Sequence, residues 1–297
     1  MKIMKKTATA LLSAIVLAGC AAAPTQEEGN SIVVGSKDFT EQHILGHMLT
    51  HLLQYNTDLD VSFVPGMSTN ILFAAIQSGD VDLYIEYTGT VYISLLGYEE
   101  ILPAQETFDI AASGLEEFGI LMLQPLGFNN TYALAVRPDT AAEYNLQTIS
   151  DLVQVSENFH FGGSFEFLAR PDGIVGLRER YGMAFASETG LEGVLTYTAL
   201  ENDEIQVTAA FATDGMLMAF ELAVLEDDLE FFPPYHAAPV IRRDIAEQHP
   251  EVPELLSQLE GILDDNTMRG LNYRVDVMHE SPQDVARDFL ISVGLIS

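Results

Sequence analysis

The residues best placed to contact a ligand follow the predicted β-strands of this chain. Lys37, the only lysine after residue 20, follows the first apolar strand, and Tyr87 follows the third. Tyr132 and Tyr235 lie where the chain crosses between two predicted α/β units, and Arg170 follows a strand of the second unit. Ligands of open α/β sheets bind at the carboxyl ends of the strands. A cleft between the two units would therefore gather aromatic rings and two cations around a small molecule.

Alternating strands and helices must hold these residues in place. In the first unit, β-branched and apolar runs predict strands, and apolar residues at helical spacing predict helices. This alternation is typical of a parallel α/β sheet. The predicted strands are 31–35, 61–64 and 81–85, and the predicted helices are 41–54 and 71–78.

The second unit begins at a strand near Tyr132, and an extended stretch, 231–241, returns the chain to the first unit. Its remaining strands are predicted at 159–163 and 205–207. Helices are predicted at 148–153, 172–181 and 214–225, and two more at the C-terminus, 253–263 and 281–293.

Motifs of known enzyme classes are missing from the sequence. There is no GxSxG, P-loop, GxGxxG or HExxH pattern. His43, His47 and His51 recur at every fourth position of one predicted helix, where two of them could bind a metal ion. Because no third ligand is identifiable, a solvated helix face is the better explanation, and we predict no metal site.

The composition is strongly acidic, with 44 Asp and Glu against 13 Lys and Arg and a formal net charge of −31. Such a surface repels nucleic acid and anionic lipid, which excludes both as partners. A salty habitat, where carboxylates keep a surface hydrated, is one explanation of this composition. Ordinary resistance to aggregation is the other.

The first twenty residues have the pattern of a lipoprotein signal. Three lysines precede an apolar stretch, 7–18, which is too short for a stable membrane span. The stretch leads to the sequence LAGC, which resembles a lipobox and ends in Cys20, the only cysteine. We expect a signal peptide at 1–19 and a tether at 20–30, with a lipid on Cys20 that anchors an extracytoplasmic, periplasmic domain to the membrane.

Four sequence elements carry a resemblance to a known family. They are GSKDFTEQHILG at 35–46, GDVDLYIEYTGT at 79–90, TDG at 213–215 and FPPY at 232–235. In this order and spacing the chain, from residue 31 to 297, resembles the osmoprotectant-binding proteins of ABC importers. These are the glycine betaine, choline and carnitine receptors of the OpuC/ProX type.

The resemblance implies an α/β, two-lobed periplasmic-binding-protein fold of type II, with the ligand in the interlobe cleft. Lobe 1 would comprise 31–129 and 234–297, and lobe 2 would comprise 130–233. The chain would act as a monomeric receptor that delivers a small osmolyte to ABC permease and ATPase subunits on separate chains. It would need no cofactor and catalyse no reaction.

The resemblance also implies a ligand site, which we carry over motif by motif. The aromatic cage for a quaternary ammonium would be Tyr87, Tyr132, Phe211 and Tyr235. The ligand carboxylate would be held by Lys37, Thr90 and Arg170, with Gln42 and Thr88 as secondary contacts.

The chemistry of a betaine agrees with this set. A trimethylammonium group cannot donate a hydrogen bond, and each aromatic face that meets it contributes ~0.5–2 kcal/mol when desolvated. A carboxylate needs charge-assisted partners, which Lys37 and Arg170 supply. Phe211 stands where the family commonly has tyrosine, so the ring remains and a hydroxyl is lost. The loop at 66–70 is also poorer in glycine than the family pattern. The two cations favour glycine betaine first, then proline betaine and carnitine, over choline.

Three alternatives remain open at this point. The first is a receptor of the same fold for another small solute, such as an amino acid or ectoine, whose ammonium would prefer carboxylates to aromatic faces. The second is an extracytoplasmic metalloenzyme that uses the histidine face. The third is a sensory or adhesin module on a lipid tether.

Overall fold

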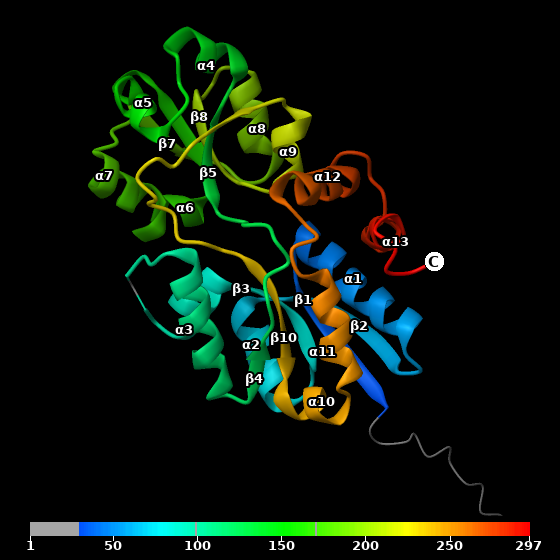
Figure 1. Cartoon of the computed structure of the whole chain (residues 1–297). Helices are drawn as coiled ribbons and strands as arrows, with labels where there is room; N and C mark the ends of the chain where they lie inside the picture. Colours follow the sequence, from blue (N-terminus) through cyan, green and yellow to red (C-terminus); the bar gives the residue numbers. More distant parts are fainter. Residues whose placement is uncertain (1–29, 99, 170) are drawn as a thin grey trace, which may run out of the picture. The chain divides into compact units, whose positions relative to one another are not determined.

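Two five-stranded β-sheets with helices packed on them form the framework of the chain (Figure 1). The structure is a computed structural model that describes residues 30–98, 100–169 and 171–297. Residues 31–297 form one compact unit, which contains both sheets. The predicted signal peptide, Cys20 with most of its tether, and Arg170 lie outside the described residues.

The first sheet joins parallel strands to an antiparallel one. β1 pairs in parallel with both β2 and β3, because helices α1 (Thr40–Asn56) and α2 (Thr69–Ser78) return the chain to the same edge before each new strand. β10 pairs antiparallel with β3 and β4, since it returns from the second sheet without a crossover helix. The parallel arrangement predicted from the first three strands is confirmed for β1 to β3, and β10, for which no direction was predicted, is antiparallel. The order is β2-β1-β3-β10-β4, with β1 at Ser31–Lys37, β2 at Asp60–Met67, β3 at Leu83–Tyr87, β4 at Ile120–Met122 and β10 at Ala237–Arg242.

The second sheet repeats this mixed arrangement. β6 pairs in parallel with β7 and β8, and β5 pairs antiparallel with β8 and β9. We call the part of the chain around the first sheet the first lobe and the part around this sheet the second lobe. The order is β7-β6-β8-β5-β9, with β5 at Tyr132–Val136, β6 at His160–Gly163, β7 at Ser187–Gly190, β8 at Val207–Phe211 and β9 at Ala223–Leu225.

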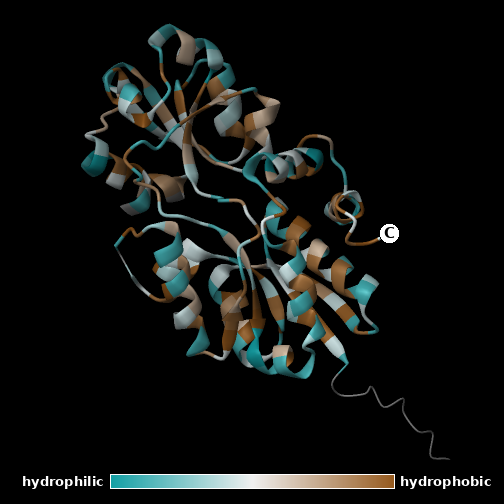
Figure 2. Ribbon diagram, viewed as in Figure 1, coloured by the Kyte–Doolittle hydropathy of each residue, from teal (hydrophilic) through white to brown (hydrophobic). Residues whose placement is uncertain are grey.

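Helix α1, Thr40–Asn56, carries the largest part of the first lobe's core. The apolar residues whose spacing predicts this helix are all buried, each with at most 1% of its surface exposed: Ile44, Leu45, Met48, Leu49, Leu52 and Leu53. α1 packs on β1 and β2 and against α13, Pro282–Ser292. Figure 2 shows hydrophobic residues concentrated along the strands of this lobe and along α1. The burial of this helix fixes its N-terminal turn at the end of β1.

The helices predicted at 71–78 and 148–153 are confirmed as α2 and α5. Gly79 ends α2 in the left-handed conformation, and Thr148 caps α5 through a capping box with Asp151. The helices are α2 at Thr69–Ser78, α3 at Ala104–Glu116, α4 at Pro138–Tyr144, α5 at Ile149–Val153, α6 at Phe165–Ala169, α7 at Gly176–Tyr181, α8 at Val194–Glu201, α9 at Gly215–Ala219, α10 at Arg243–Gln248, α11 at Glu251–Leu256 and α12 at Asp265–Asp276, with a π-helical turn at Thr90–Leu95.

Two segments connect the lobes, between β4 and β5 and between β9 and β10 (Figure 1). They are hydrogen-bonded to each other. The amide of Asn130 donates to the carbonyl of Tyr235 at 3.1 Å, and the amide of Tyr235 donates to Oδ1 of Asn129 at 2.7 Å. The predicted lobe boundaries at 129/130 and 233/234 fall on these segments and stay a prediction.

The structure departs from the predicted helices at 214–225 and at α12. The predicted helix at 214–225 ends early, because α9 stops at Ala219, Glu221 takes a positive φ of 50° and β9 follows. α12 was not predicted at all, since polar residues dominate its sequence. It brings Asn272 to the site described next.

Candidate functional site

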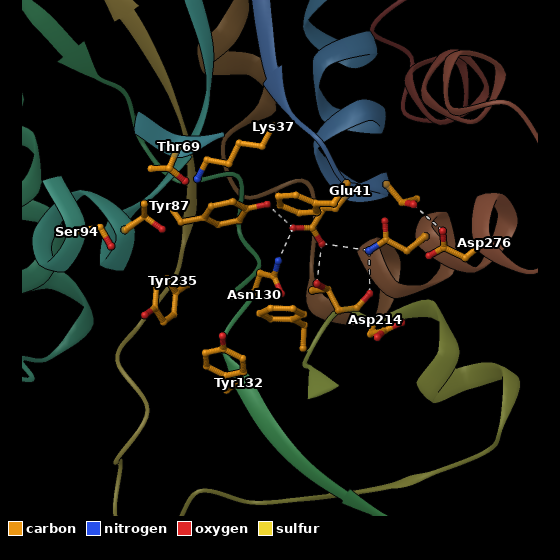
Figure 3. A pocket seen from close by; sticks show the side chains of 16 residues that line it. Lys37, Glu41, Thr69, Tyr87, Ser94, Asn130, Tyr132, Asp214, Tyr235 and Asp276 are labelled. Atoms are coloured by element: carbon orange, nitrogen blue, oxygen red, sulfur yellow. Dashed lines mark hydrogen bonds between the residues drawn. The ribbon is translucent and has the colours of Figure 1, made fainter. Parts of the chain in front are cut away.

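A cleft of about 490 Å³ lies at the carboxyl ends of β1 and β3 and receives side chains from both lobes (Figure 3). Tyr87 comes from the end of β3, Tyr132 from the start of β5 and Phe211 from the end of β8. The lining residues are Lys37, Phe39, Thr40, Glu41, Thr69, Tyr87, Thr90, Ser94, Asn130, Tyr132, Phe211, Thr213, Asp214, Tyr235, Asn272 and Asp276.

All four predicted aromatic residues line this cleft. Tyr132 and Phe211 are cross-strand partners, so their rings stack, with centroids 4.9 Å apart. The Tyr235 hydroxyl donates a hydrogen bond of 2.9 Å to Asp172. Phe39, which the sequence did not single out, also lines the cleft and stacks 6.3 Å from Tyr87. Its position inside the motif GSKDFTEQ, 35–42, could have indicated a place at the ligand site.

Lys37 lines the cleft but has a protein partner. Its ammonium forms an ion pair with the carboxylate of Glu86, whose side chain has no exposed surface. The same ammonium lies 5.0 Å from the centre of the Tyr87 ring. Only 7% of the surface of Lys37 is exposed. The structure thus gives this lysine a role within the fold, and its predicted contact with a ligand carboxylate stays a prediction.

The other predicted polar contacts divide into three groups. Thr90, at the start of the π-helical turn, lines the cleft. Gln42 and Thr88 are buried and bonded to the backbone: Gln42 donates to the carbonyl of Ile85 at 3.0 Å, and Thr88 donates to that of Pro234 at 3.1 Å. Neither of these two lines the cleft. Arg170 lies outside the described residues.

Glu41, which the sequence did not single out, is the centre of a hydrogen-bond network in the cleft. This residue is in the first turn of α1 and has 3% of its surface exposed. Its carboxylate accepts four hydrogen bonds, shown as dashed lines in Figure 3. The donors are Tyr87 Oη at 2.7 Å, Asn130 Nδ2 at 2.9 Å, Thr213 Oγ1 at 2.6 Å and Asn272 Nδ2 at 3.1 Å. Because Thr213 follows β8 of the second lobe, Glu41 joins the two lobes directly.

Burial sets the electrostatics of this carboxylate. Desolvation raises the pKa of Glu41 above its usual value, and the four hydrogen bonds oppose the rise. Burial and the Glu41 carboxylate also raise the pKa of the Tyr87 phenol, which therefore stays protonated and donates. In its ionised form Glu41 is a negative charge held by neutral donors alone.

Further carboxylates make the lining acidic. Burial raises the pKa of both Asp214 and Asp276, which line the cleft beside Glu41. Among the described lining residues, Lys37 is the one Lys or Arg side chain, and Glu86 pairs with it. A cation is therefore favoured in this cleft over an anion.

The three histidines of α1 lie away from the cleft. The His47 ring packs 4.5 Å from Phe63 and 6.1 Å from His51, measured between centroids. Burial, with smaller effects of His51 and His43, lowers the pKa of His47 to about 4. Within the described residues, no group of three or more His, Cys, Asp or Glu side chains is arranged to hold a metal ion. No helix of the described part of the chain is long and apolar enough to cross a membrane.

Comparisons with known proteins agree with this architecture. A family model, the substrate-binding domain of ABC-type glycine betaine transport systems, matches residues 30–292. The glycine-betaine-binding protein of Pseudomonas aeruginosa is 36% identical over 274 residues, 89% of this chain and 88% of that protein. The ergothioneine transport permease/ergothioneine binding protein of Helicobacter pylori is 38% identical over 270 residues, 90% of this chain. The chain spans 48% of that protein, about half its length.

A solved structure supports the same assignment. The crystal structure of a glycine betaine/carnitine/choline ABC transporter protein superposes with a TM-score of 0.85 at 30% identity, covering 90% of this chain and all of that one. The two-lobed type II fold and the family that the sequence elements predict are thereby confirmed. The chain belongs to the family of substrate-binding domains of ABC-type glycine betaine transport systems.

Proposed function

We propose that this chain is the extracytoplasmic solute receptor of an ABC importer and binds a solute that carries a quaternary ammonium group. The observation that carries the proposal is the set of aromatic rings from both lobes, Tyr87, Tyr132, Phe211 and Tyr235, around one acidic cleft. A trimethylammonium group has no N–H to donate, so aromatic faces are its best partners. The negative charge of Glu41 adds long-range attraction without requiring a hydrogen bond from the ligand.

The remaining parts of this proposal rest on the family. The receptor would be lipid-anchored through Cys20, act as a monomer without catalysing a reaction, and deliver its solute to separate permease and ATPase subunits. Glycine betaine, proline betaine, carnitine and choline are the candidate ligands. The name of the Pseudomonas relative supports glycine betaine. That of the Helicobacter relative supports ergothioneine, a larger betaine built on an imidazole ring.

Calorimetric titration of the purified chain tests the proposal. We expect glycine betaine or choline to bind, and 3,3-dimethyl-1-butanol, the uncharged carbon analogue of choline, to bind at least about tenfold more weakly. Tyr132→Leu should weaken binding of the cation by about tenfold. The control is Tyr144→Leu, which removes an exposed ring of α4 that does not line the cleft and should leave the affinity unchanged. Equal affinity for the cation and its uncharged analogue would exclude recognition by a cage.

A second candidate is a receptor of the same fold for an amino acid. The buried carboxylates of Glu41 and Asp214 favour it, since a primary ammonium would donate hydrogen bonds to such groups. Titration with the common amino acids and with ectoine distinguishes the two. Binding of an amino acid that survives Tyr132→Leu would replace the quaternary-ammonium proposal.

A further inference from the structure

Two amide side chains in the cleft have carbonyl oxygens without a hydrogen-bond donor. Oδ1 of Asn130 and Oδ1 of Asn272 are buried, and no described residue donates to either atom. Asn272 has only 4% of its surface exposed. Both residues line the cleft. An acceptor that is buried and unpaired costs folding free energy, so such a pair at a ligand site needs an explanation.

Glu41 fixes the orientation of both amides. A carboxylate accepts hydrogen bonds and, when ionised, donates none, so each amide must turn its NH₂ group toward Glu41. Nδ2 of Asn130 lies 2.9 Å from one carboxylate oxygen, and Nδ2 of Asn272 lies 3.1 Å from the other. Nδ2 of Asn272 also donates to the carbonyl of Thr213 at 2.8 Å. Both hydrogens of that amide are thus used, and its oxygen must point elsewhere.

The charged side chains of the cleft lining are acceptors or are already paired. Asp214 accepts hydrogen bonds from the Tyr197 hydroxyl and from the amide of Met216, and Asp276 accepts one from Thr40. The cation among the described lining residues, Lys37, pairs with Glu86. The Glu41 side of the cleft therefore presents acceptors. Figure 3 shows the amide of Asn130 turned toward the Glu41 carboxylate, with Asp214 and Asp276 to the right of Glu41 in the view.

We propose that Asn130 and Asn272 form a second subsite, which accepts a hydrogen bond from an O–H or N–H group of the bound solute. The inference rests on the proposed function and narrows it. The preferred ligand is then a quaternary ammonium compound that also carries a donor: a hydroxyl, as in choline and carnitine, or a ring N–H, as in betaines derived from histidine. Glycine betaine, which has no donor, leaves both oxygens unpaired.

Matched pairs of ligands test the subsite on the unmodified protein. Each pair keeps the charge and removes the donor: choline and its methyl ether, carnitine and γ-butyrobetaine, histidine betaine and its ring N-methyl derivative. We expect the donor-bearing member of at least one pair to bind about tenfold more tightly or better, because a site built to accept a hydrogen bond rejects an analogue that lacks it. Equal affinity within all three pairs overturns the subsite and leaves the receptor proposal intact.

Substitutions then assign the effect to the two amides. In Asn130→Ala and in Asn272→Ala the affinity ratio within the responsive pair should fall toward one. If the amides had only a structural role, each substitution would weaken the binding of both ligands of the pair equally. The affinity ratio would then stay unchanged, and this result would also overturn the subsite. Asn266→Ala, at an exposed position of α12 outside the cleft lining, is the matched control.

Two further outcomes complete the test. If Asn272→Ala does not fold, Asn130→Ala and the unmodified protein still decide the question. If no quaternary ammonium compound binds at all, the receptor proposal itself fails and the subsite fails with it.

Discussion

The ammonium of Lys37 lies against the carboxylate of Glu86, deep in the first lobe, where Glu86 has no exposed surface and Lys37 has 7%. The two residues come from neighbouring strands of one sheet, β1 and β3. An unpaired charge at this depth would be strongly destabilising, so each residue requires the other. This pairing explains why the chain keeps a lysine here, whether or not a ligand carboxylate also contacts it.

Loss of the lysine should therefore destabilise the protein. We expect Lys37→Met to lower the free energy of unfolding by about 3–5 kcal/mol, because it leaves the Glu86 carboxylate buried and unpaired. Urea unfolding followed by circular dichroism measures this. Adding Glu86→Gln to Lys37→Met should restore a large part of the loss.

The same variants separate the two roles of Lys37. If Lys37→Met is as stable as the parent and reduces only the affinity for glycine betaine, the pair has no structural role. A larger loss of affinity for glycine betaine than for choline would support the predicted carboxylate contact.

Binding of a cation should depend on pH through Glu41. Burial raises the pKa of this carboxylate, so the group loses its negative charge at a higher pH than an exposed glutamate does. The affinity for choline should then fall by roughly tenfold as the pH decreases through that raised pKa. Titrations between pH 8 and pH 4.5 check this.

Two other carboxylates titrate in the same direction, because the pKa values of Asp214 and Asp276 are also raised. Glu41→Gln isolates the contribution of Glu41, since its profile should be flatter than that of the parent. Identical profiles of the parent and Glu41→Gln would mean that Glu41 does not contribute charge to binding.

Acid should destabilise the first lobe through His47. Burial lowers the pKa of this ring from its usual 6.5 to about 4. Between these values the unfolded chain binds more protons than the folded one, so stability is lost as the pH falls through this window. After allowance for the partial exposure of the ring, we expect the free energy of unfolding to fall by about 1 kcal/mol between pH 7 and pH 4.5. The fall should be smaller in His47→Gln.

Urea midpoints at the two pH values measure the effect of His47. His160→Gln, at an exposed position of β6 in the second lobe, is the control and should behave as the parent does. A parent protein whose midpoint is the same at both pH values would contradict the assignment.

A methyl group at Gly89 should disturb the cage. The backbone of Gly89 is helical, with φ of −65°, so alanine is allowed by conformation and excluded only by space. A Cβ there would lie 2.7 Å from the carbonyl of Pro234 and 2.8 Å from the Tyr235 ring. We expect Gly89→Ala to displace Tyr235, weaken ligand binding by about tenfold and destabilise the fold by about 1–3 kcal/mol.

The control for Gly89 is Gly270→Ala in α12, where nothing lies within 4 Å of the added carbon. This variant should bind as the parent does and be at least as stable. Normal binding by Gly89→Ala would show that Tyr235 tolerates the shift.

Sequence reasoning succeeded where local pattern decides. Apolar periodicity predicts α1, and two of the tyrosines singled out from the sequence, Tyr87 at the end of β3 and Tyr132 at the start of β5, line the cleft. It did not find Glu41, because its four partners lie 46, 89, 172 and 231 residues away. In a chain with 44 acidic residues, nothing local marks one of them as buried.

The errors in the fold have similar causes. α12 is mostly polar, so the sequence analysis missed it, although Asp264 caps its first turn and Met268 and Leu271 are buried where it packs against α1 and α9. The break after α9 depends on the positive φ of Glu221, which residue type does not reveal. The antiparallel direction of β10 follows from the path between the lobes rather than from its own residues.

The hydrogen-bonded pair of connecting segments limits how the lobes can move. Because the backbone of Asn130 is bonded to that of Tyr235, and Thr131 bonds to Pro233, neither segment can rotate alone. Any bend between the lobes would therefore have to move the two segments together. Asn130 and Tyr235 lie on these paired segments, whereas Phe211 ends β8 of the second lobe. A movement of the second lobe would thus change the distance between the Phe211 and Tyr235 rings, which line the same cleft, and with it the shape of the cage.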